Sequence, residues 1–428
     1  MIKIIKYPKK KLWNKLAQRP VLETTGLETA VEKMISKVKK QGDKAVCRYT
    51  KKFDHVKLKT LVVSKKEIEA GQKLLSMELI TAIQQAKQNI EKFHQAQVDE
   101  VKYIETMPGI KCWRKSAGIE KVGIYIPGGT APLFSTVLML AIPAAIAGCK
   151  EIVLCTPPSK DGTVHPAILY TADLCGIKQI FKAGGVQAIA AMAYGTESIP
   201  GVFKIFGPGN QYVNCAKQFV QKDGVAIDMP AGPSEVIIIA DESAVPEFIA
   251  ADLLSQAEHG TDSQVILLTY SEILAKKVKN CIAEQIKELP RKAMAEKTLL
   301  NSKIILLNNP CDAIEFSNLY APEHLILACN NAEEISSEVI AAGSVFLGNY
   351  SPESAGDYAS GTNHTLPTNG YAAIYSGVSV DSFVKKITFQ QLTKEGLKNI
   401  GNTVMLMADA EGLAAHKQSI ALRLKNRI

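Results

Sequence analysis

Short, continuous apolar runs that alternate with helical stretches constrain the fold of this chain of 428 residues more than any other feature. Such runs are typical of parallel strands buried on both faces, and intervals of about ten to eighteen residues suit the covering helices. The first series of predicted strands covers 122–126, 151–155, 179–181 and 202–206, and the second covers 235–240, 264–269, 303–307, 325–328 and 344–347. Because a turn-rich segment, 228–233, separates the series, the sequence predicts two α/β units of similar size.

The rest of the chain lacks this strand pattern. Residues 1–24 are predicted to form a basic arm of poor periodicity, and apolar residues recur at helical spacing from Gly26 to about Gln97. The strand pattern stops after about Tyr375, and 393–427 has the pattern of an amphipathic helical tail. Such a tail either packs on its own body or reaches across to a partner.

The overall composition is that of a globular protein with a mild basic excess. Hydrophobic residues make up 46% of the chain, and 50 Lys and Arg stand against 42 Asp and Glu. The basic start carries no zinc-finger, basic-zipper or aromatic-interleaved pattern, so we expect no nucleic-acid partner. The 28 uncharged residues between Lys121 and Lys150 exceed the ~20 needed to span a bilayer, but a Pro-Gly-Gly turn at 127–129 and Pro143 interrupt them. We expect no membrane span.

The cysteines and the start of the chain predict a cellular compartment. The nine cysteines are scattered singly and form no CxxC pair, which is not the pattern of a disulfide scaffold. The chain begins MIKIIKYPKKKLW, without the apolar stretch of a secretory signal. Together these features predict a reducing, cytoplasmic location.

Two histidines stand beside groups with which they could share a chemical task. Gln256 and His259 are three residues apart at the end of a predicted helix, so one face can present an amide oxygen and an imidazole nitrogen to one ion. A histidine stabilised by the helix end alone fits equally well. Glu323 and His324 stand directly before an apolar strand and suit proton transfer near neutral pH. They can act at one site only if they lie on the loop, and a surface polar pair is the alternative.

Further candidate groups lie in the last quarter of the chain. The glycine-rich stretch 356–364 carries Asp357, a plausible hard oxygen ligand. Glu411 and His416 are five apart on the predicted tail helix and diverge by about 140°, so both reach one small ligand only across it. One Gln, two His and one Asp give a mixed ligand set that suits Zn²⁺ or a similar ion and leaves positions open for substrate.

Three glycine-rich turns point to a ligand at the first sheet. The turns 126–130, 183–187 and 206–210 each follow a predicted strand and open a helix. They should therefore meet at the carboxyl edge of one parallel sheet, where helix N-termini favour phosphate groups. A nucleotide is compatible with this arrangement, although none of the turns matches GxGxxG or a Walker A loop.

Five stretches, taken in order and spacing, resemble the histidinol dehydrogenase family. They are YIPGG at 125–129, GPGN at 207–210, the run from IDMPAGPSEV at 227–236 through QAEHG at 256–260, APEHL at 321–325 and GDYASGTNH at 356–364. The resemblance extends over about residues 20 to 420. It implies an enzyme of histidine biosynthesis that oxidises L-histidinol to L-histidine through a bound aldehyde, with two NAD⁺ and one Zn²⁺ per subunit.

The resemblance also implies an architecture. Members of the family are homodimers with two incomplete Rossmann-like domains and small terminal extensions. The corresponding division here is an arm (1–24), a metal- and substrate-binding unit (25–121 with 232–378), an NAD-binding unit (122–231) and a helical tail (379–428). In the family the tail completes the site of the neighbouring subunit.

Residue roles carry over position by position. The resemblance implies Gln256, His259, Asp357 and His416 as zinc ligands, and Glu323 and His324 as the acid–base pair. Substrate contacts are implied for Ser234, Gln256, His259, His324, Asp357, Glu411 and His416. Contacts with NAD are implied for Tyr125, Gln187 and Asn210.

Other readings of the same residues stay open at this point. A cysteine, Cys112 or Cys149, could trap the aldehyde as a thiohemiacetal, although both cysteines have the sequence context of structural residues. A zinc hydrolase could use the same ligand set, but it would have no use for three glycine turns at a second sheet. A two-lobed binding protein would explain the two units but not the clustered ionisable residues.

Overall fold

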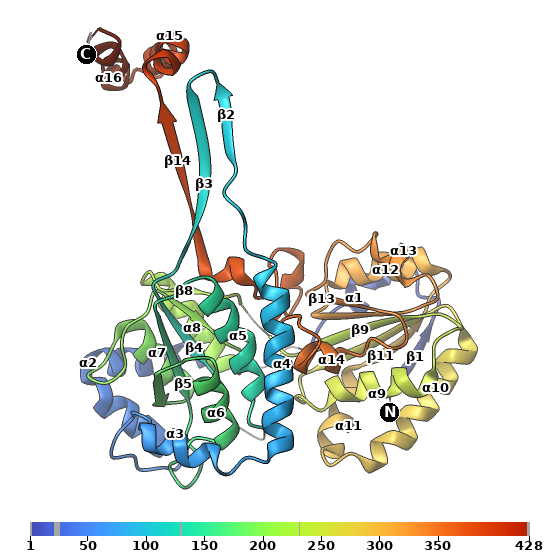
Figure 1. The fold of residues 1–428 in the computed structure, drawn as a ribbon. Helices are drawn as coiled ribbons and strands as arrows, with labels where there is room; N and C mark the ends of the chain where they lie inside the picture. Colours follow the sequence, from blue (N-terminus) through green and yellow to red (C-terminus); the bar gives the residue numbers. More distant parts are fainter. Residues whose placement is uncertain (1, 21–25, 129–130, 231, 426–428) are drawn as a thin grey trace.

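The computed structural model describes residues 2–20, 26–128, 131–230 and 232–425. Two α/β bodies lie side by side, and a narrow three-stranded arm projects from them with two helices at its tip (Figure 1). The predicted fold class is confirmed: two parallel sheets are covered by helices, with a helical section near the N-terminus and a helical tail. All nine predicted strands are present, and eight of them consist mostly of buried or half-buried residues. The exception is β13 (Ser344–Leu347) at the edge of its sheet, where exposed and half-buried residues alternate.

The five-stranded parallel sheet forms the core of the first body. Its strand order is β6-β5-β4-β7-β8, and the strands are β4 (Lys121–Tyr125), β5 (Glu151–Thr156), β6 (Gln179–Lys182), β7 (Lys204–Phe206) and β8 (Ala226–Ile227). Its helices are α5 (Phe134–Ile146), α6 (Pro166–Leu174), α7 (Gly185–Tyr194) and α8 (Gln211–Lys222). The helix α5 is apolar nearly all round because it is buried between this sheet and α4, so the long uncharged stretch belongs to a core.

The six-stranded parallel sheet forms the core of the second body. Its order is β1-β11-β10-β9-β12-β13, and the strands are β1 (Lys3–Lys6), β9 (Glu235–Ala240), β10 (Gln264–Thr269), β11 (Lys303–Leu306), β12 (His324–Ala328) and β13 (Ser344–Leu347). Its helices are α9 (Pro246–Ala257), α10 (Glu272–Gln285), α11 (Lys292–Asn301), α12 (Pro310–Tyr320), α13 (Ala332–Ser336) and α14 (Glu353–Tyr358). Short 3-10 turns lie at Lys10–Leu12, Ile286–Glu288, Tyr371–Ala373 and Val380–Phe383.

The N-terminal segment is more ordered than predicted. Residues 1–24 were expected to form an arm without a strand, but Lys3–Lys6 pairs in parallel with β11 as the edge of the six-stranded sheet. Only two apolar residues, Ile4 and Ile5, separate its flanking lysines, so an edge strand of this length leaves no clear burial pattern in the sequence. The helix α1 (Trp13–Leu16) follows, and its Trp13 is buried against Phe316 of α12.

The helical section near the N-terminus packs on a different body from the one predicted. The helices are α2 (Leu27–Phe53), α3 (Lys65–Gln72) and α4 (Met77–Gln95). Residues 25–121 were predicted to belong with the second body, but the apolar faces of α2 and α4 are buried against the helices of the first body. The sequence shows that these helices have an apolar face, but the surface that receives this face is set by tertiary packing.

The projecting arm is the largest feature that the sequence analysis missed. The strands β2 (Tyr103–Met107), β3 (Ile110–Gly118) and β14 (Val384–Leu392) form an antiparallel sheet that carries α15 (Lys394–Ala410) and α16 (Ala414–Lys425) at its tip (Figure 1). The expectation that no strand follows Tyr375 is therefore wrong, whereas the helical tail is confirmed. The strands β2 and β14 are exposed along most of their length, β3 is mostly half-buried, and all three carry charged residues among the apolar ones. Their sequences therefore lack the regular alternation that predicts a strand on a core.

Within the described residues no helix has the length and apolar character needed to cross a membrane. The nine cysteines are all free thiols, and no pair of them forms a disulfide. The absence of disulfides agrees with the pattern of single, scattered cysteines.

Candidate active site

Four of the predicted site residues meet in one buried cluster at the second body. Gln256 lies in the last turn of α9, Glu323 directly before β12, His324 at the first position of β12, and Asp357 in α14. Successive parallel strands begin at the same edge of a sheet, and α9 runs back to that edge, which is how distant segments converge. The cluster therefore lies at the amino edge of the six-stranded sheet.

The distances within the cluster are those of direct contact. The Nε2 atom of Gln256 lies 3.1 Å from Nδ1 of His324 and 3.4 Å from Oε2 of Glu323. The His324 ring has its Nδ1 3.6 Å from Oε2 of Glu323 and its Nε2 3.6 Å from Oδ1 of Asp357. The side chains of Glu323 and His324 thus lie at one place, because Glu323 still belongs to the loop while His324 is the first residue of the strand.

A fifth member of the cluster, Glu353, was missed in the sequence. Its side chain is buried, and its Oε1 lies 3.7 Å from Nδ1 of His324. Glu353 and Asp357 are four residues apart in α14 and so share a helical face. The spacing of the two carboxylates could have been noticed in the sequence. It was missed because the glycine-rich stretch considered there begins at residue 356 and so leaves Glu353 out.

The cluster has the donor set of a divalent cation site. One ligand atom each from His324, Glu353 and Asp357 lie within 4.8 Å of one another. Three buried polar atoms have no hydrogen-bond partner: Oε1 of Gln256, Nε2 of His324 and Oε2 of Glu353. Buried polar atoms are costly unless they are paired, so the residues present fit a metal ion of the zinc class.

The charges of the cluster also fit a bound cation. Burial raises the pKa of Glu323 to about 8, and it also raises the pKa of Glu353. Burial lowers the pKa of His324, but the surrounding carboxylates outweigh that effect and raise it overall. Burial likewise raises the pKa of Asp357, but the contact with His324 outweighs it and the pKa is lowered. Three acids around one imidazole form a site whose charge a cation would balance.

Two further predicted residues stand at the rim of the cluster. His259 follows α9 and is more exposed than Gln256. Partial burial lowers the pKa of His259, and this effect outweighs the negative charge of Asp357, which raises it. Ser234 directly precedes β9, on the same edge of the sheet as His324. His364 reaches across to the first body: its Nδ1 donates to the carbonyl oxygen of Asp357 at 2.7 Å, and its Nε2 lies 3.0 Å from Oγ1 of Thr136 in α5.

The chain does not bring Glu411 and His416 to this cluster. Glu411 caps the end of α15 and His416 lies in α16, and both are exposed. Figure 1 shows these helices at the tip of the projecting arm, far from α9 and α14. Within one chain, the predicted ligand set is therefore incomplete.

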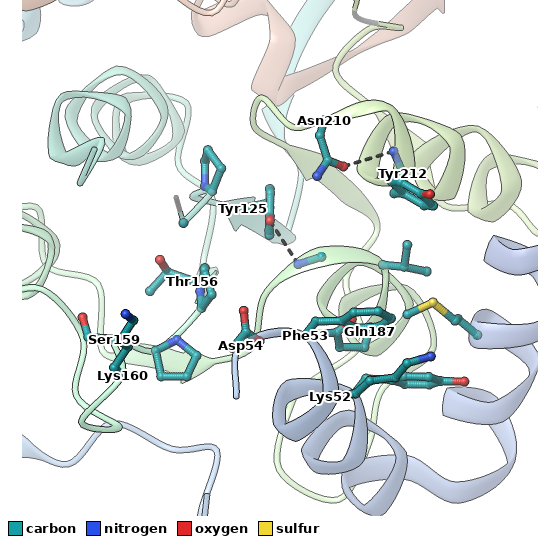
Figure 2. Close-up of a pocket in the computed structure, with 18 of the residues that line it drawn as sticks. Lys52, Phe53, Asp54, Tyr125, Thr156, Ser159, Lys160, Gln187, Asn210 and Tyr212 are labelled. Carbon is teal, nitrogen blue, oxygen red and sulfur yellow. Dashed lines mark hydrogen bonds between the residues drawn. The ribbon is translucent and has the colours of Figure 1, made fainter. Parts of the chain in front are cut away.

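The three residues predicted to contact NAD line one cavity of the first body. Tyr125, Gln187 and Asn210 face a cavity of about 940 Å³ at the carboxyl edge of the five-stranded sheet (Figure 2). The Tyr125 hydroxyl accepts a hydrogen bond from the backbone N–H of Gly185 at 3.0 Å, and Asn210 caps α8. The other wall of the cavity comes from α2, with Lys33, Lys37 and Lys52, and from Asp54 directly after this helix.

The glycine turns shape this cavity by close backbone approach. Gly207 has φ +127°, and a Cβ there would lie 2.0 Å from the carbonyl oxygen of Tyr125. A Cβ on Gly184 would lie 2.6 Å from the Pro157 side chain. The predicted turns after β6 and β7 thus lie at one edge with the described part of the turn after β4, and a helix follows each of them. Residues 129 and 130 of the predicted turn 126–130 lie outside the described residues.

Neither candidate cysteine nucleophile lies at these sites. Cys112 belongs to β3 of the arm, and Cys149 follows α5 with its thiol 3.8 Å from the carbonyl oxygen of Phe383. Burial raises the pKa of Cys149 to about 11, which suppresses the reactive thiolate. The thiohemiacetal alternative has no support in this geometry.

Known proteins with the same sequence pattern identify the family. A model of histidinol dehydrogenase matches residues 17–424. The chain belongs to the histidinol dehydrogenase family. A histidinol dehydrogenase of Bacteroides thetaiotaomicron is 60% identical over 424 residues, covering 99% of both chains. One of Vibrio parahaemolyticus is 52% identical over 413 residues, covering 96% of this chain and 95% of its own.

Solved structures agree. The crystal structure of histidinol dehydrogenase from Elizabethkingia anophelis matches with a TM-score of 0.98 and 58% identity, covering 99% of this chain and 98% of that one. An acetylating aldehyde dehydrogenase of Geobacillus thermoglucosidasius matches with a TM-score of 0.50 at 14% identity, which shows a shared fold only. As a member of the histidinol dehydrogenase family, the chain is an NAD-dependent oxidoreductase that oxidises histidinol in histidine biosynthesis.

Proposed function

We propose that this chain catalyses the four-electron oxidation of L-histidinol to L-histidine through a bound aldehyde, with Zn²⁺ and two successive NAD⁺. The observation that carries the proposal is the convergence of Gln256, Glu323, His324 and Asp357 in one buried cluster. Acid–base groups alone would serve many enzymes. A cluster with the donor set of a cation, in a chain that also carries a dinucleotide-sized cavity, suits an NAD-linked oxidation.

Zinc would be held by Gln256, His259 and Asp357, together with His416 of a second copy of the chain. The unpartnered Oε1 of Gln256 supports this assignment, and Glu353 adds a carboxylate that the sequence did not suggest. Bound there, zinc would grip the imidazole and amine of the substrate and so position the carbinol carbon. Glu411 of the second copy supplies an anion for the cationic side of the substrate, and Ser234 adds a polar contact at the rim.

NAD would occupy the cavity lined by Tyr125, Gln187 and Asn210. The N-termini of α7 and α8 open into this cavity, and Lys33 and Lys52 line its far wall, so it suits a pyrophosphate. The Oε1 of Gln187 is buried without a partner and is therefore ready to accept a hydrogen bond from a ligand. When bound, the cofactor accepts one hydride in each of the two oxidations.

The acid–base pair divides the two steps. In the first, His324 in its neutral form removes the proton of the substrate alcohol while the hydride leaves the carbinol carbon. The carboxylates around His324 raise its pKa, and a bound cation that balances their charge would favour this neutral form. In the second, Glu323 removes a proton from water, which attacks the enclosed aldehyde and gives the hydrated form that is oxidised to the acid. A carboxyl group whose pKa is raised toward neutrality by burial suits such a general base.

A second copy of the chain is the natural partner of the projecting arm. The arm exposes apolar side chains that a monomer would leave in water, and its aromatic residues Tyr103, Trp113 and Phe389 stack along one face. Its tip carries Glu411 and His416, the two predicted site residues that one chain cannot bring to its own cluster. A homodimer that exchanges these tips would complete both sites, in the reducing cytoplasm that the cysteine pattern predicts.

The proposal is tested by NADH formation from L-histidinol with the purified chain. We expect about two NADH per histidinol consumed, loss of activity after chelation, and its return with Zn²⁺. A panel of amino alcohols without an imidazole serves as the substrate control and should give little turnover. Formation of only one NADH, with release of free aldehyde, would contradict the four-electron reaction.

A further inference from the structure

Arg19, in the N-terminal segment, reaches the back of the catalytic cluster. The exposed fraction of its side chain is 16%, and its guanidinium makes contacts on two sides. On one side it pairs with the carboxylate of Glu235 through Nε and Nη2, with Nη2 2.9 Å from Oε2. On the other side Nη2 donates to the carbonyl oxygen of Tyr320 at 2.7 Å and lies 3.4 Å from that of Ala321.

The first side fixes a hydrogen-bond donor to the proposed base. The backbone N–H of Glu235 donates to Oε2 of Glu323 at 2.8 Å. The Glu235 side chain is almost fully buried, and the backbone N–H of Asn369 donates to its Oε1 at 3.0 Å. Arg19 therefore anchors the residue whose main chain holds the carboxylate of Glu323.

The second side fixes the turn that carries the base. Tyr320 ends α12, and Ala321 has φ +51°, a left-handed conformation that costs free energy in a residue other than glycine. Carbonyl groups at a helix C-terminus need donors, and Arg19 supplies them two residues before Glu323. The guanidinium also stacks 3.9 Å from the ring centre of Tyr320, which orients its plane.

We propose that Arg19 is a positioning residue for the hydration step: it clamps the strand start at Glu235 to the turn 320–321 and so sets the place of the Glu323 carboxylate. The inference rests on the proposed role of Glu323 as the base of the second oxidation. Arg19 itself touches no reacting atom. Its removal should affect the first oxidation much less. The Nδ1 atom of His324 also lies 3.3 Å from the carbonyl oxygen of Glu235, but His324 is held in addition by the pairing of β12 with β9 and by its contact with Gln256.

The chain offers a matched control for a merely structural effect. Lys303 also ties the N-terminal segment to the six-stranded sheet, since its Nζ donates to the carbonyl oxygen of Leu16 at 3.0 Å. That contact is half-buried and cationic, like the one of Arg19, but none of its contacts reaches Glu235 or the turn before Glu323. Lys303→Ala therefore loosens the same segment without releasing the base.

The experiment uses the full-length holoenzyme and separates the two half-reactions. Oxidation of L-histidinal with NAD⁺ reports the hydration step, and reduction of L-histidinal with NADH reports the first step in reverse. We expect Arg19→Ala to lower kcat of the NAD⁺ reaction about 100-fold and to leave the NADH reaction within about twofold. Added guanidinium ion should restore part of the lost rate, and Arg19→Lys should fall between the two because it cannot form the forked pair.

Other outcomes would overturn the inference. Equal losses in both half-reactions, an effect no larger than that of Lys303→Ala, or no rescue by guanidinium would each assign Arg19 a structural role only. If Arg19→Ala fails to fold, Glu235→Gln keeps the backbone N–H and the side-chain shape, and it should show the same selective loss at about tenfold. An unaltered enzyme that is inactive in both half-reactions would contradict the proposed function instead.

Discussion

The two parallel sheets place their candidate sites at opposite edges. The five-stranded sheet uses its carboxyl edge, where backbone turns and the starts of α7 and α8 line a cavity. The six-stranded sheet uses its amino edge, where α9 and α12 end and side chains from Gln256 to Asp357 gather. One body therefore presents backbone donors, whereas the other presents carboxylates, an amide and imidazoles.

The difference follows from the direction of the helices. Helices of a parallel sheet begin at its carboxyl edge and end at its amino edge, so the first edge gathers partial positive charge and the second partial negative charge. The first suits the phosphates of a dinucleotide, and the second suits a metal cation. One type of α/β architecture can therefore hold ligands of opposite charge at the two edges of its sheet.

The comparison predicts that metal removal will separate the two sites. After chelation we expect turnover to be abolished and the affinity for L-histidinol to fall at least about 100-fold, because the cluster loses the cation that grips the substrate. The affinity for NAD⁺, measured by calorimetry on the same sample, should change by less than about threefold. Added Zn²⁺ should restore turnover and the affinity for L-histidinol. An equal loss of affinity for NAD⁺ after chelation would show that the sites at the two edges do not bind independently.

Within the amino edge, the two adjacent catalytic residues should be separable. Glu323→Gln should lower oxidation of L-histidinal by NAD⁺ about 10³-fold, since an amide cannot accept the proton of water, and should leave reduction of L-histidinal by NADH within about threefold. Steady-state assays of both half-reactions measure this. Glu333→Gln, an exposed carboxylate of α13, is the control. Equal loss in both directions would remove the division of labour between Glu323 and His324.

The amino edge should also depend on a second copy of the chain. In the oxidation of L-histidinal by NAD⁺, His416→Ala and Glu323→Gln should each be nearly inactive. The first change removes a group that one chain delivers to another, and the second removes a group of the cluster itself. A mixed dimer, purified through two different tags, should recover about half the activity of the unaltered dimer, since one of its two sites is intact. The control is a dimer of each variant alone, purified through the same two tags. An inactive mixed dimer would mean that both residues serve the same chain's site.

Much of the fold and of the cluster was predictable from the sequence, for a physical reason. Strands such as β9 and β12 are buried on both faces, so their apolar runs show directly in the sequence. Gln256, Glu323, His324 and Asp357 stand at the ends of such elements, where topology brings polar groups together. Their convergence in the structure agrees with that reasoning, although their individual roles stay predictions.

What was missed has the opposite character. The strands β2 and β14 are mostly exposed, and β3 between them is mostly half-buried. None of the three packs one face on a core, so their sequences show no alternation of apolar and polar residues. The pairing of Arg19 with Glu235 joins residues 216 positions apart, and neither local sequence contains a pattern that predicts the pairing. Glu353 was within reach, because its spacing from Asp357 places both on one helical face. Exposed strands and contacts between distant residues are thus the two kinds of feature that could not be predicted from the sequence.

The smallest predicted effect concerns the carboxyl edge, where the backbone makes the site. The Oδ1 atom of Asn210 accepts hydrogen bonds from the backbone N–H groups of Tyr212 at 3.0 Å and Val213 at 3.1 Å, and so caps α8 at the rim of the cavity. Asn210→Ala should lower the free energy of unfolding by about 1 kcal/mol and raise the KM for NAD⁺, with the KM for L-histidinol unchanged.

The matched control for this change is Ser76→Ala. Ser76 caps α4 through the N–H of Leu79 at 3.2 Å, at a helix that does not line the cavity. It should cost a similar stability in denaturant unfolding but leave both KM values unchanged. If both variants raised the KM for NAD⁺ alike, the effect would come from general loosening. A change confined to Asn210 would mean that the cap and the dinucleotide depend on the same backbone groups, as the carboxyl edge requires.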